Sequence, residues 1–176
     1  KYQNVFNINL IFNSHQHSFS KTVNSGIINS NPNNDILLLN NDILALTSFE
    51  PFIYFSREHN KVGIIGAKLL YPDGTIQHAG IIRIKYTKKF DHVYRHENQY
   101  LQETNYPKKY ISVTGACFYI NRSLISTIGL FDENYVLSYE DIDYCVNAQL
   151  NDYEVWYNPE VRMIHYESTT RKNTTN

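Results

Sequence analysis

The chain has 176 residues, of which 42% are hydrophobic and 19% are charged, as in a globular protein with a buried core. Sixteen basic residues against seventeen acidic ones leave a net charge of −1, which argues against nucleic acid as a partner. Cys117 and Cys145 lie far apart, outside any Cys-x-x-Cys pair. This spacing argues against a disulfide scaffold or a structural zinc site and favours a reducing, cytoplasmic compartment.

The first elements of the chain predict alternating strands and helices. Val5–Phe12 is rich in β-branched and aromatic residues and predicts a strand. A helix capped by Ser18 or Ser20 is expected to run to Ile28. Residues 35–39 form a continuous apolar run, which is typical of a strand buried on both faces of a parallel sheet.

The next elements predict a helix and then a hairpin. A helix capped by Thr47 or Ser48 is expected to end near His59. Residues 62–70 predict a strand that returns through a β-turn into residues 75–80. The glycines of this region lack the spacing of a phosphate-binding loop, so we expect them to allow close packing.

The second half of the chain begins with a stretch that has no clear periodicity. Residues 83–109 are polar and rich in tyrosine, and they predict a functional loop or insertion. Residues 111–120 predict a strand whose small central residues leave room either for a ligand or for a tight packing contact. A helix over 122–128 is expected to end at Gly129, and helical spacing returns over 140–150.

The last elements are two short strands. Residues 154–157 and 161–164 both predict strands, with a break at Asn158-Pro159 between them. We expect a single domain over residues 1–171, followed by a polar tail at 172–176. No apolar run approaches the roughly 20 residues of a membrane helix.

Several polar residues stand where chemistry is plausible, but each also has a structural interpretation. Asp42 follows the strand 35–39, a position where open α/β sheets bind ligands, although an Asx turn explains it equally well. His165 ends the last strand and suits either a metal or a structural hydrogen bond. Glu140 and Asp141 favour a solvated first helical turn on spacing alone. A lone His such as His78 is more often packed than catalytic.

Two further histidines are spaced like a metal-binding pair. His92 and His96 stand four residues apart and would face one side of a helix. Without a third ligand in register, a solvated face is favoured.

Seven segments in one order carry a family resemblance. They are Leu37–Asp42, Val62–Gly66, Leu69–Gly80, Val113–Cys117, Phe131–Glu133, Tyr139–Cys145 and His165–Ser168. Together they resemble a family-2 glycosyltransferase of the GT-A fold, from the bacterial branch that builds O-antigen and other surface polysaccharides. The resemblance runs from about Phe12 to Arg171.

The resemblance implies a metal site on the donor diphosphate. Asn40-Asn41-Asp42 occupies the position of the family's Asp-x-Asp motif, so Asp42 is the expected ligand of Mg²⁺ or Mn²⁺. Asn40 stands where many members have Asp, which leaves the metal one fewer anionic ligand. Asn40 and Asn41 are expected to lie beside the donor. His165 matches the His that completes the metal site.

The resemblance also implies catalytic and substrate-binding residues. Asp141 matches the catalytic base of a Glu-Asp motif that begins at Glu140. Thr114-Gly115-Ala116 resembles the segment that lines the sugar and acceptor pocket, and His78 is grouped with these substrate-binding residues.

Lys21 and Asn24 fall in the donor-side helix, where they are expected to bind the nucleotide-sugar. The family usually has Gly-Phe near the start of this helix, and this chain departs from that with His17-Ser18-Phe19.

The implied fold is an α/β domain of GT-A type, with a Rossmann-like, mixed and mainly parallel sheet flanked by helices, lacking the N-terminal nucleotide-binding βαβ unit. The implied function is inverting transfer of a hexosyl or deoxyhexosyl group from a nucleotide-sugar donor to a polysaccharide or lipid-linked glycan acceptor. It would act at the inner face of the membrane, with peripheral association through the acceptor. The alternative is a non-catalytic fragment or remnant that acts as a binding or assembly module, with homo-oligomer contacts covering an exposed sheet edge.

Overall fold

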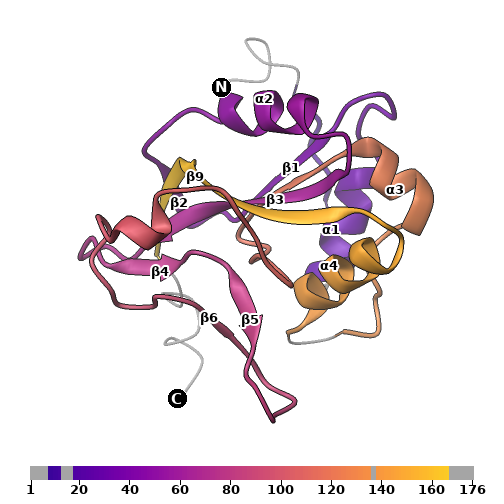
Figure 1. Ribbon diagram of the computed structural model, residues 1–176. Coiled ribbons are helices and arrows are strands. Elements are labelled where there is room, and N and C mark those ends of the chain that lie inside the picture. Colours follow the sequence, from indigo (N-terminus) through magenta and orange to yellow (C-terminus); the bar gives the residue numbers. More distant parts are fainter. Residues whose placement is uncertain (1–7, 13–17, 136–137, 167–176) are drawn as a thin grey trace, which may run out of the picture.

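The computed structural model describes residues 8–12, 18–135 and 138–166 (Figure 1). Residues 5–7 of the predicted first strand and the predicted polar tail at 172–176 lie outside the described residues. Residues 8–12 carry no strand, so that part of the prediction is wrong. Among the described residues, every helix is too short or too polar to cross a membrane.

The centre of the fold is a seven-stranded mixed sheet. Its strands in spatial order are β1 (Ile36–Leu39), β8 (Cys117–Ile120), β3 (Val62–Leu70), β9 (Glu154–His165) and β2 (Ile43–Ala45), with β4 (Ile76–His78) beside β3 and β7 (Lys108–Lys109) beside β9. Among the described strands, only β3 and β9 pair in parallel. The expected mixed sheet is therefore confirmed, but the expectation that it is mainly parallel is wrong.

Strand β1 was predicted at the right place but in the wrong environment. It pairs antiparallel with β8 at one end of the strand order, and Leu39 is 46% exposed. A continuous apolar run therefore did not mean burial on both faces. Strand β2 was not predicted, because a strand of three residues is too short to show a periodicity.

Strands β3 and β9 form the buried axis of the sheet. All nine residues of β3 are buried, and β9 runs beside it without interruption. The predicted break at Asn158-Pro159 is wrong. The pairing instead shifts register, so that Ala67 faces Asn158 while Lys68 faces Arg162. Such a bulge lets a strand tolerate Pro, which has no N–H to donate to its neighbour.

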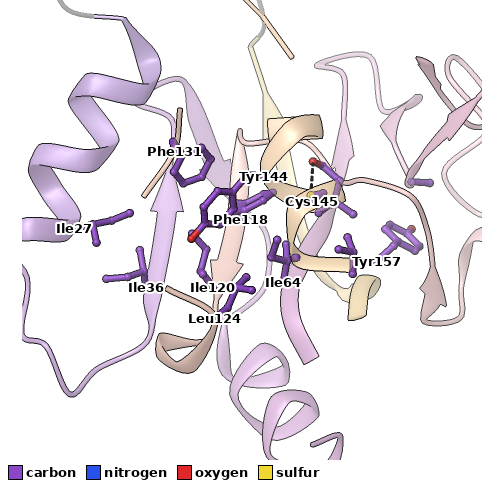
Figure 2. Close-up of a cluster of buried hydrophobic side chains, with 14 of the residues drawn as sticks. Ile27, Ile36, Ile64, Phe118, Ile120, Leu124, Phe131, Tyr144, Cys145 and Tyr157 are labelled. Carbon is purple, nitrogen blue, oxygen red and sulfur yellow. Dashed lines mark hydrogen bonds between the residues drawn. The ribbon is translucent and has the colours of Figure 1, made fainter. Parts of the chain in front are cut away.

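Helices cover both faces of this sheet (Figure 1). Helix α2 (Glu50–Glu58) packs Phe52 against one face. The other face carries α1 (Phe19–Ile28), α3 (Arg122–Ile128) and α4 (Glu140–Leu150). Figure 2 shows the cluster beneath these three helices, in which Ile27, Leu124 and Tyr144 meet the strand residues Ile64 and Phe118.

The helix boundaries agree with the predictions except at one cap. Ser18 caps α1, and Gly129 ends α3 as expected. Helix α2 begins after Phe49 without a side-chain cap, because the Thr47 hydroxyl hydrogen-bonds to the Glu160 carbonyl and Ser48 to the Glu50 carboxylate.

The hairpin of β3 and β4 is confirmed, and so is close packing at a glycine. A Cβ on Gly66 would collide with the side chain of Val113 on the crossing segment. Both cysteines are buried free thiols, and burial raises the pKa of each to about 12.

The stretch 83–109 is more ordered than its sequence suggested. Strands β5 (Ile81–Arg83) and β6 (Phe90–His92) form a hairpin that projects from the main sheet, and a 3₁₀ turn, η1 (Gln102–Thr104), follows (Figure 1). The buried Lys68 on β3 connects this stretch to the main sheet. Its ammonium group donates hydrogen bonds to the Gln99 carbonyl, Thr104 Oγ1 and Asn105 Oδ1. Burial lowers the pKa of Lys68 to about 8.

Candidate active site

The first part of the site joins Asp42 to His165. Strand β2 pairs with the end of β9 so that Ile43 faces His165, which places the preceding Asp42 beside the imidazole. Asp42 Oδ1 lies 3.2 Å from His165 Nε2. The backbone N–H of Tyr166 donates to the Asp42 carbonyl at 2.9 Å and closes the pair. The two residues that the motif order singled out therefore meet, although 122 intervening positions separate them.

Gln77 determines which nitrogen of His165 carries the proton. The Gln77 amide donates to the His165 carbonyl at 3.4 Å, which orients its Oε1 toward Nδ1 of the ring at 2.8 Å. Because Oε1 can only accept, Nδ1 carries the hydrogen, and Nε2 of the neutral ring keeps its lone pair. That lone pair faces the Asp42 carboxylate.

This arrangement fits a divalent metal. Asp42 Oδ1 is buried, and no hydrogen-bond donor reaches it from the described residues while His165 is neutral. Two acceptors 3.2 Å apart repel one another unless a proton or a cation lies with them. No group of three or more His, Cys, Asp or Glu gathers within the described ranges, so this part of the chain offers two ligands. Two ligands suit a metal that is also held by substrate phosphates.

The second part of the site is Asp141 in the first turn of α4. Its Oδ2 accepts a hydrogen bond from the Gly115 N–H at 3.0 Å, and its Oδ1 accepts from the Ile142 N–H at 2.8 Å. Burial raises the pKa of Asp141, and the neighbouring Glu140 carboxylate raises it further, while the Gly115 N–H opposes both. Asp141 is thus a hydrogen-bonded carboxylate with increased basicity.

The segment Thr114-Gly115-Ala116 connects the two parts. On one side the Ala116 carbonyl accepts from the Asn40 N–H at 3.0 Å, and on the other Gly115 donates to Asp141. The predicted strand over 111–120 is confined to β8, because these three residues direct their N–H groups to side chains. Thr114 N–H points to His78 Nε2 at 3.5 Å, and Ala116 N–H to Thr114 Oγ1 at 3.5 Å.

His78 lies behind this segment. It is fully buried, and its Nδ1 lies 3.0 Å from Nδ1 of His92 on the projecting hairpin. Burial lowers the pKa of His78 well below its ordinary value, and the nearby His92 and Arg95 lower it further. His78 contacts the Thr114–Ala116 segment through the Thr114 N–H, and its role in substrate binding stays a prediction. His92 and His96 contact different partners, because His92 lies beside His78 whereas His96 stacks on Tyr71.

The remaining predicted residues differ in their access to the site. The Asn40 amide lies 3.4 Å from His165 Nε2, and Asn41 is exposed beside it. Lys21 is exposed on α1. Asn24 is buried, and its amide is bonded to Phe131 N–H, the Phe131 carbonyl and the Glu133 carboxylate. These bonds hold the 131–133 segment against α1, and donor binding by Asn24 stays a prediction.

A hollow of about 360 Å³ opens over Asp141. Phe90, His92 and Arg95 from the β5–β6 region form one wall, and Tyr139 at the start of α4 forms the other. Sequence reasoning missed these residues. The stretch 83–109 had no periodicity to place them, and an aromatic residue just before the acidic turn was the only signal for Tyr139.

A comparison with solved structures decides the fold. The crystal structure of GalNAc-T7 with UDP, GalNAc and Mn²⁺ matches 94% of this chain and 33% of its own, with a TM-score of 0.73 at 12% identity. The chain has the GT-A glycosyltransferase fold. The match at this low identity rests on architecture alone.

Curated sequences similar to this GT-A domain come from bacteria. The O-antigen biosynthesis protein RfbC of Myxococcus xanthus is 28% identical over 143 residues, which cover 78% of this chain. The uncharacterised protein y4gI of Sinorhizobium fredii is 34% identical over 114 residues, or 62% of this chain. The domain spans only 11% and 12% of their lengths. No family model matches it. These similarities and the fold confirm the resemblance to family-2-like glycosyltransferases.

Proposed function

We propose that this GT-A domain transfers a sugar from a nucleotide-sugar donor to a hydroxyl group of a glycan or lipid-linked glycan, with inversion at the anomeric carbon. One observation carries the proposal. The Thr114–Ala116 segment bonds on one side to the strand end that bears Asp42 and on the other to Asp141. The Asp42–His165 pair, which a cation would stabilise, and the Asp141 carboxylate therefore lie on either side of one stretch of backbone.

The donor diphosphate would lie at Asp42 and His165. Both present acceptor atoms to one point, which suits Mn²⁺ or Mg²⁺, and the nitrogen ligand favours Mn²⁺. When bound, the metal would act as a Lewis acid for the charge that develops on the leaving nucleoside diphosphate. GalNAc-T7, which shares the fold, was crystallised with UDP and Mn²⁺, and this supports the assignment.

Asp141 would take the proton of the attacking hydroxyl. It opens onto the 360 Å³ hollow, and its raised pKa makes it a better proton acceptor than an exposed Asp. The Gly115 and Ile142 N–H groups each occupy one of its oxygens, which fixes the carboxylate and leaves further lone pairs for the hydroxyl. With one base and no enzyme nucleophile, the acceptor attacks the anomeric carbon directly and inverts it.

Calorimetric titration with UDP, GDP and dTDP, with and without Mn²⁺, tests the donor side. We expect one nucleotide to bind only with metal, Asp42→Ala to abolish that binding, and Asp141→Asn to preserve it. A folded wild-type chain that binds none of the three nucleotides would overturn the proposal and favour a non-catalytic binding or assembly module.

A further inference from the structure

A second hollow lies beside the one over Asp141. We call the hollow over Asp141 the inner hollow and its neighbour the outer hollow. The outer hollow measures about 480 Å³, and Phe90, Tyr139 and Ile142 line both. Tyr135 and Lys88 line only the outer hollow. Each volume falls within the range of about 300–1,000 Å³ that is typical of small-ligand sites. The two are therefore adjoining compartments along one surface.

Tyr139, which lines both hollows, has an unusual backbone conformation. Tyr139 is the N-cap of α4, where Ser, Thr, Asp or Asn would normally bond a free N–H, and it makes no side-chain cap. Its φ of +76° is in the left-handed region, which is unfavourable for an aromatic residue. The Tyr139 ring lies edge-on to Phe90, with ring centroids 6.4 Å apart. Residues with such strained backbone conformations cluster at active sites and ligand-binding sites.

The chemistry of the outer hollow suits a sugar ring. Pyranose rings have apolar C–H faces that pack on aromatic side chains, and hydroxyl groups at their edges that need polar partners. Tyr139, Phe90 and Tyr135 supply the aromatic surface. Asp143, whose carboxylate accepts from the Tyr135 hydroxyl at 3.1 Å, and Lys88 supply polar groups at the same hollow. A purely hydrocarbon ligand would leave this carboxylate and this ammonium group without a new partner.

We propose that the outer hollow binds the sugar residue that follows the acceptor sugar, so that the acceptor is an oligosaccharide of at least two units. This inference rests on the proposed function, because it places the acceptor hydroxyl in the inner hollow at Asp141. Continuity carries the argument: a glycan that presents one ring to Asp141 and continues past the shared residues Phe90 and Tyr139 reaches the aromatic surface of the outer hollow.

The test compares binding of saccharides by length. The probes are fluorescently labelled mono-, di- and trisaccharides obtained by partial acid hydrolysis of bacterial O-antigen polysaccharides. Tyr139→Asn removes the ring but keeps a residue that tolerates the left-handed conformation, so the fold is retained. Tyr106→Asn is the matched control, because Tyr106 is also half exposed at 54% and lies outside both hollows.

We expect the disaccharide to bind the wild-type chain about tenfold more tightly than the monosaccharide, an effect of the size that aromatic contacts supply. Tyr139→Asn should remove this gain, so that the monosaccharide and the disaccharide bind equally, while Tyr106→Asn keeps it. Equal affinity for all lengths, a gain that survives in Tyr139→Asn, or no saccharide binding would overturn the inference. So would farnesyl phosphate binding that Tyr139→Asn alone abolishes.

A parallel titration of the same variants with UDP, GDP and dTDP in the presence of Mn²⁺ separates this inference from the proposed function. If nucleotides bind but affinity does not rise with saccharide length, only the inference about the outer hollow is overturned. Loss of all nucleotide binding in the folded wild-type chain overturns the proposed function as well.

Discussion

Asp42 and Asp141 lie on either side of the Thr114–Ala116 segment, and the two carboxylates differ in the hydrogen-bond donors around them. Asp141 receives two backbone N–H groups and is satisfied by the protein itself. Asp42 Oδ1 has no hydrogen-bond donor from the described residues and lies 3.2 Å from His165 Nε2, where a proton or a cation would balance the two acceptors. We therefore propose proton transfer for one Asp and metal binding for the other because the hydrogen-bond donors around them differ, rather than because of their depth alone.

The largest expected effect comes from removing the charge of Asp141. Asp141→Asn should lower transfer by about 10²–10⁴-fold, the usual contribution of a general base, while nucleotide binding persists. Because burial raises the pKa of Asp141, ionisation of this group disfavours folding as pH rises through its titration, but the amide NH₂ of Asn would face one of the two N–H donors, so the melting temperature serves to show that the variant is folded. Substantial turnover by the variant, measured as released nucleotide, would exclude Asp141 as the base.

The next largest effect is expected at Gln77, which orients the proposed metal ligand His165. Gln77→Ala should weaken Mn²⁺ binding about 10–100-fold, because His165 loses the partner that fixes its tautomer. Gln102→Ala, at an exposed position, is the control. Calorimetry with Mn²⁺ and the nucleotide measures the effect. Equal affinity in both variants would show that His165 needs no such support.

A smaller effect is expected where the two sides of the site meet. A Cβ at Gly115 would lie 3.0 Å from Cζ of Phe19 and 3.5 Å from Cβ of Asp141. Gly115→Ala should therefore cost about 1–3 kcal/mol of unfolding free energy through overpacking. Adding Phe19→Leu should restore part of it, and urea denaturation measures both. A loss that the second change does not relieve would place the strain in the backbone rather than against the ring.

The smallest effect is a pH dependence. The pKa of His78 is lowered in the folded state from an ordinary value of 6.5, so the unfolded chain binds more protons below that pH. The contribution of His78 to stability is complete above about pH 6.5 and declines as the pH falls, by at most about 1.4 kcal/mol per pH unit. His78→Gln should flatten the profile relative to wild type, whereas His96→Gln at an exposed position should not. Identical profiles for the two variants would contradict this.

The sequence was most informative where a residue's meaning depends on its near neighbours. Ser18 and Gly129 marked helix ends correctly because capping is local. The motif order singled out Asp42, His165 and Asp141, and the structure brings the first two together, while the catalytic roles of all three stay predictions. What failed depended on distant partners. Neither the antiparallel setting of β1 nor the Gln77 contact with His165 leaves a periodic signal in the chain.

Tyr139 shows the same limit at a single residue. Helical spacing located the start of α4, but no pattern predicts that an aromatic side chain would occupy the left-handed cap. The long strand β9 likewise crosses a Pro that normally ends a strand, because its partner β3 accommodates the bulge. Both features are decided by tertiary packing.

The pairing of β2 with the end of β9 also has a consequence for when the proposed metal site can form. His165 belongs to the last described strand, yet it lies beside Asp42, the other proposed metal ligand, which precedes it by more than a hundred positions. During synthesis, a chain that has emerged only as far as α4 carries Asp42 and Asp141 but lacks the imidazole. Long-range strand pairings of this kind form late in folding. Metal binding at Asp42 is therefore expected to report the completed fold, and its appearance during refolding would time the docking of the final strand.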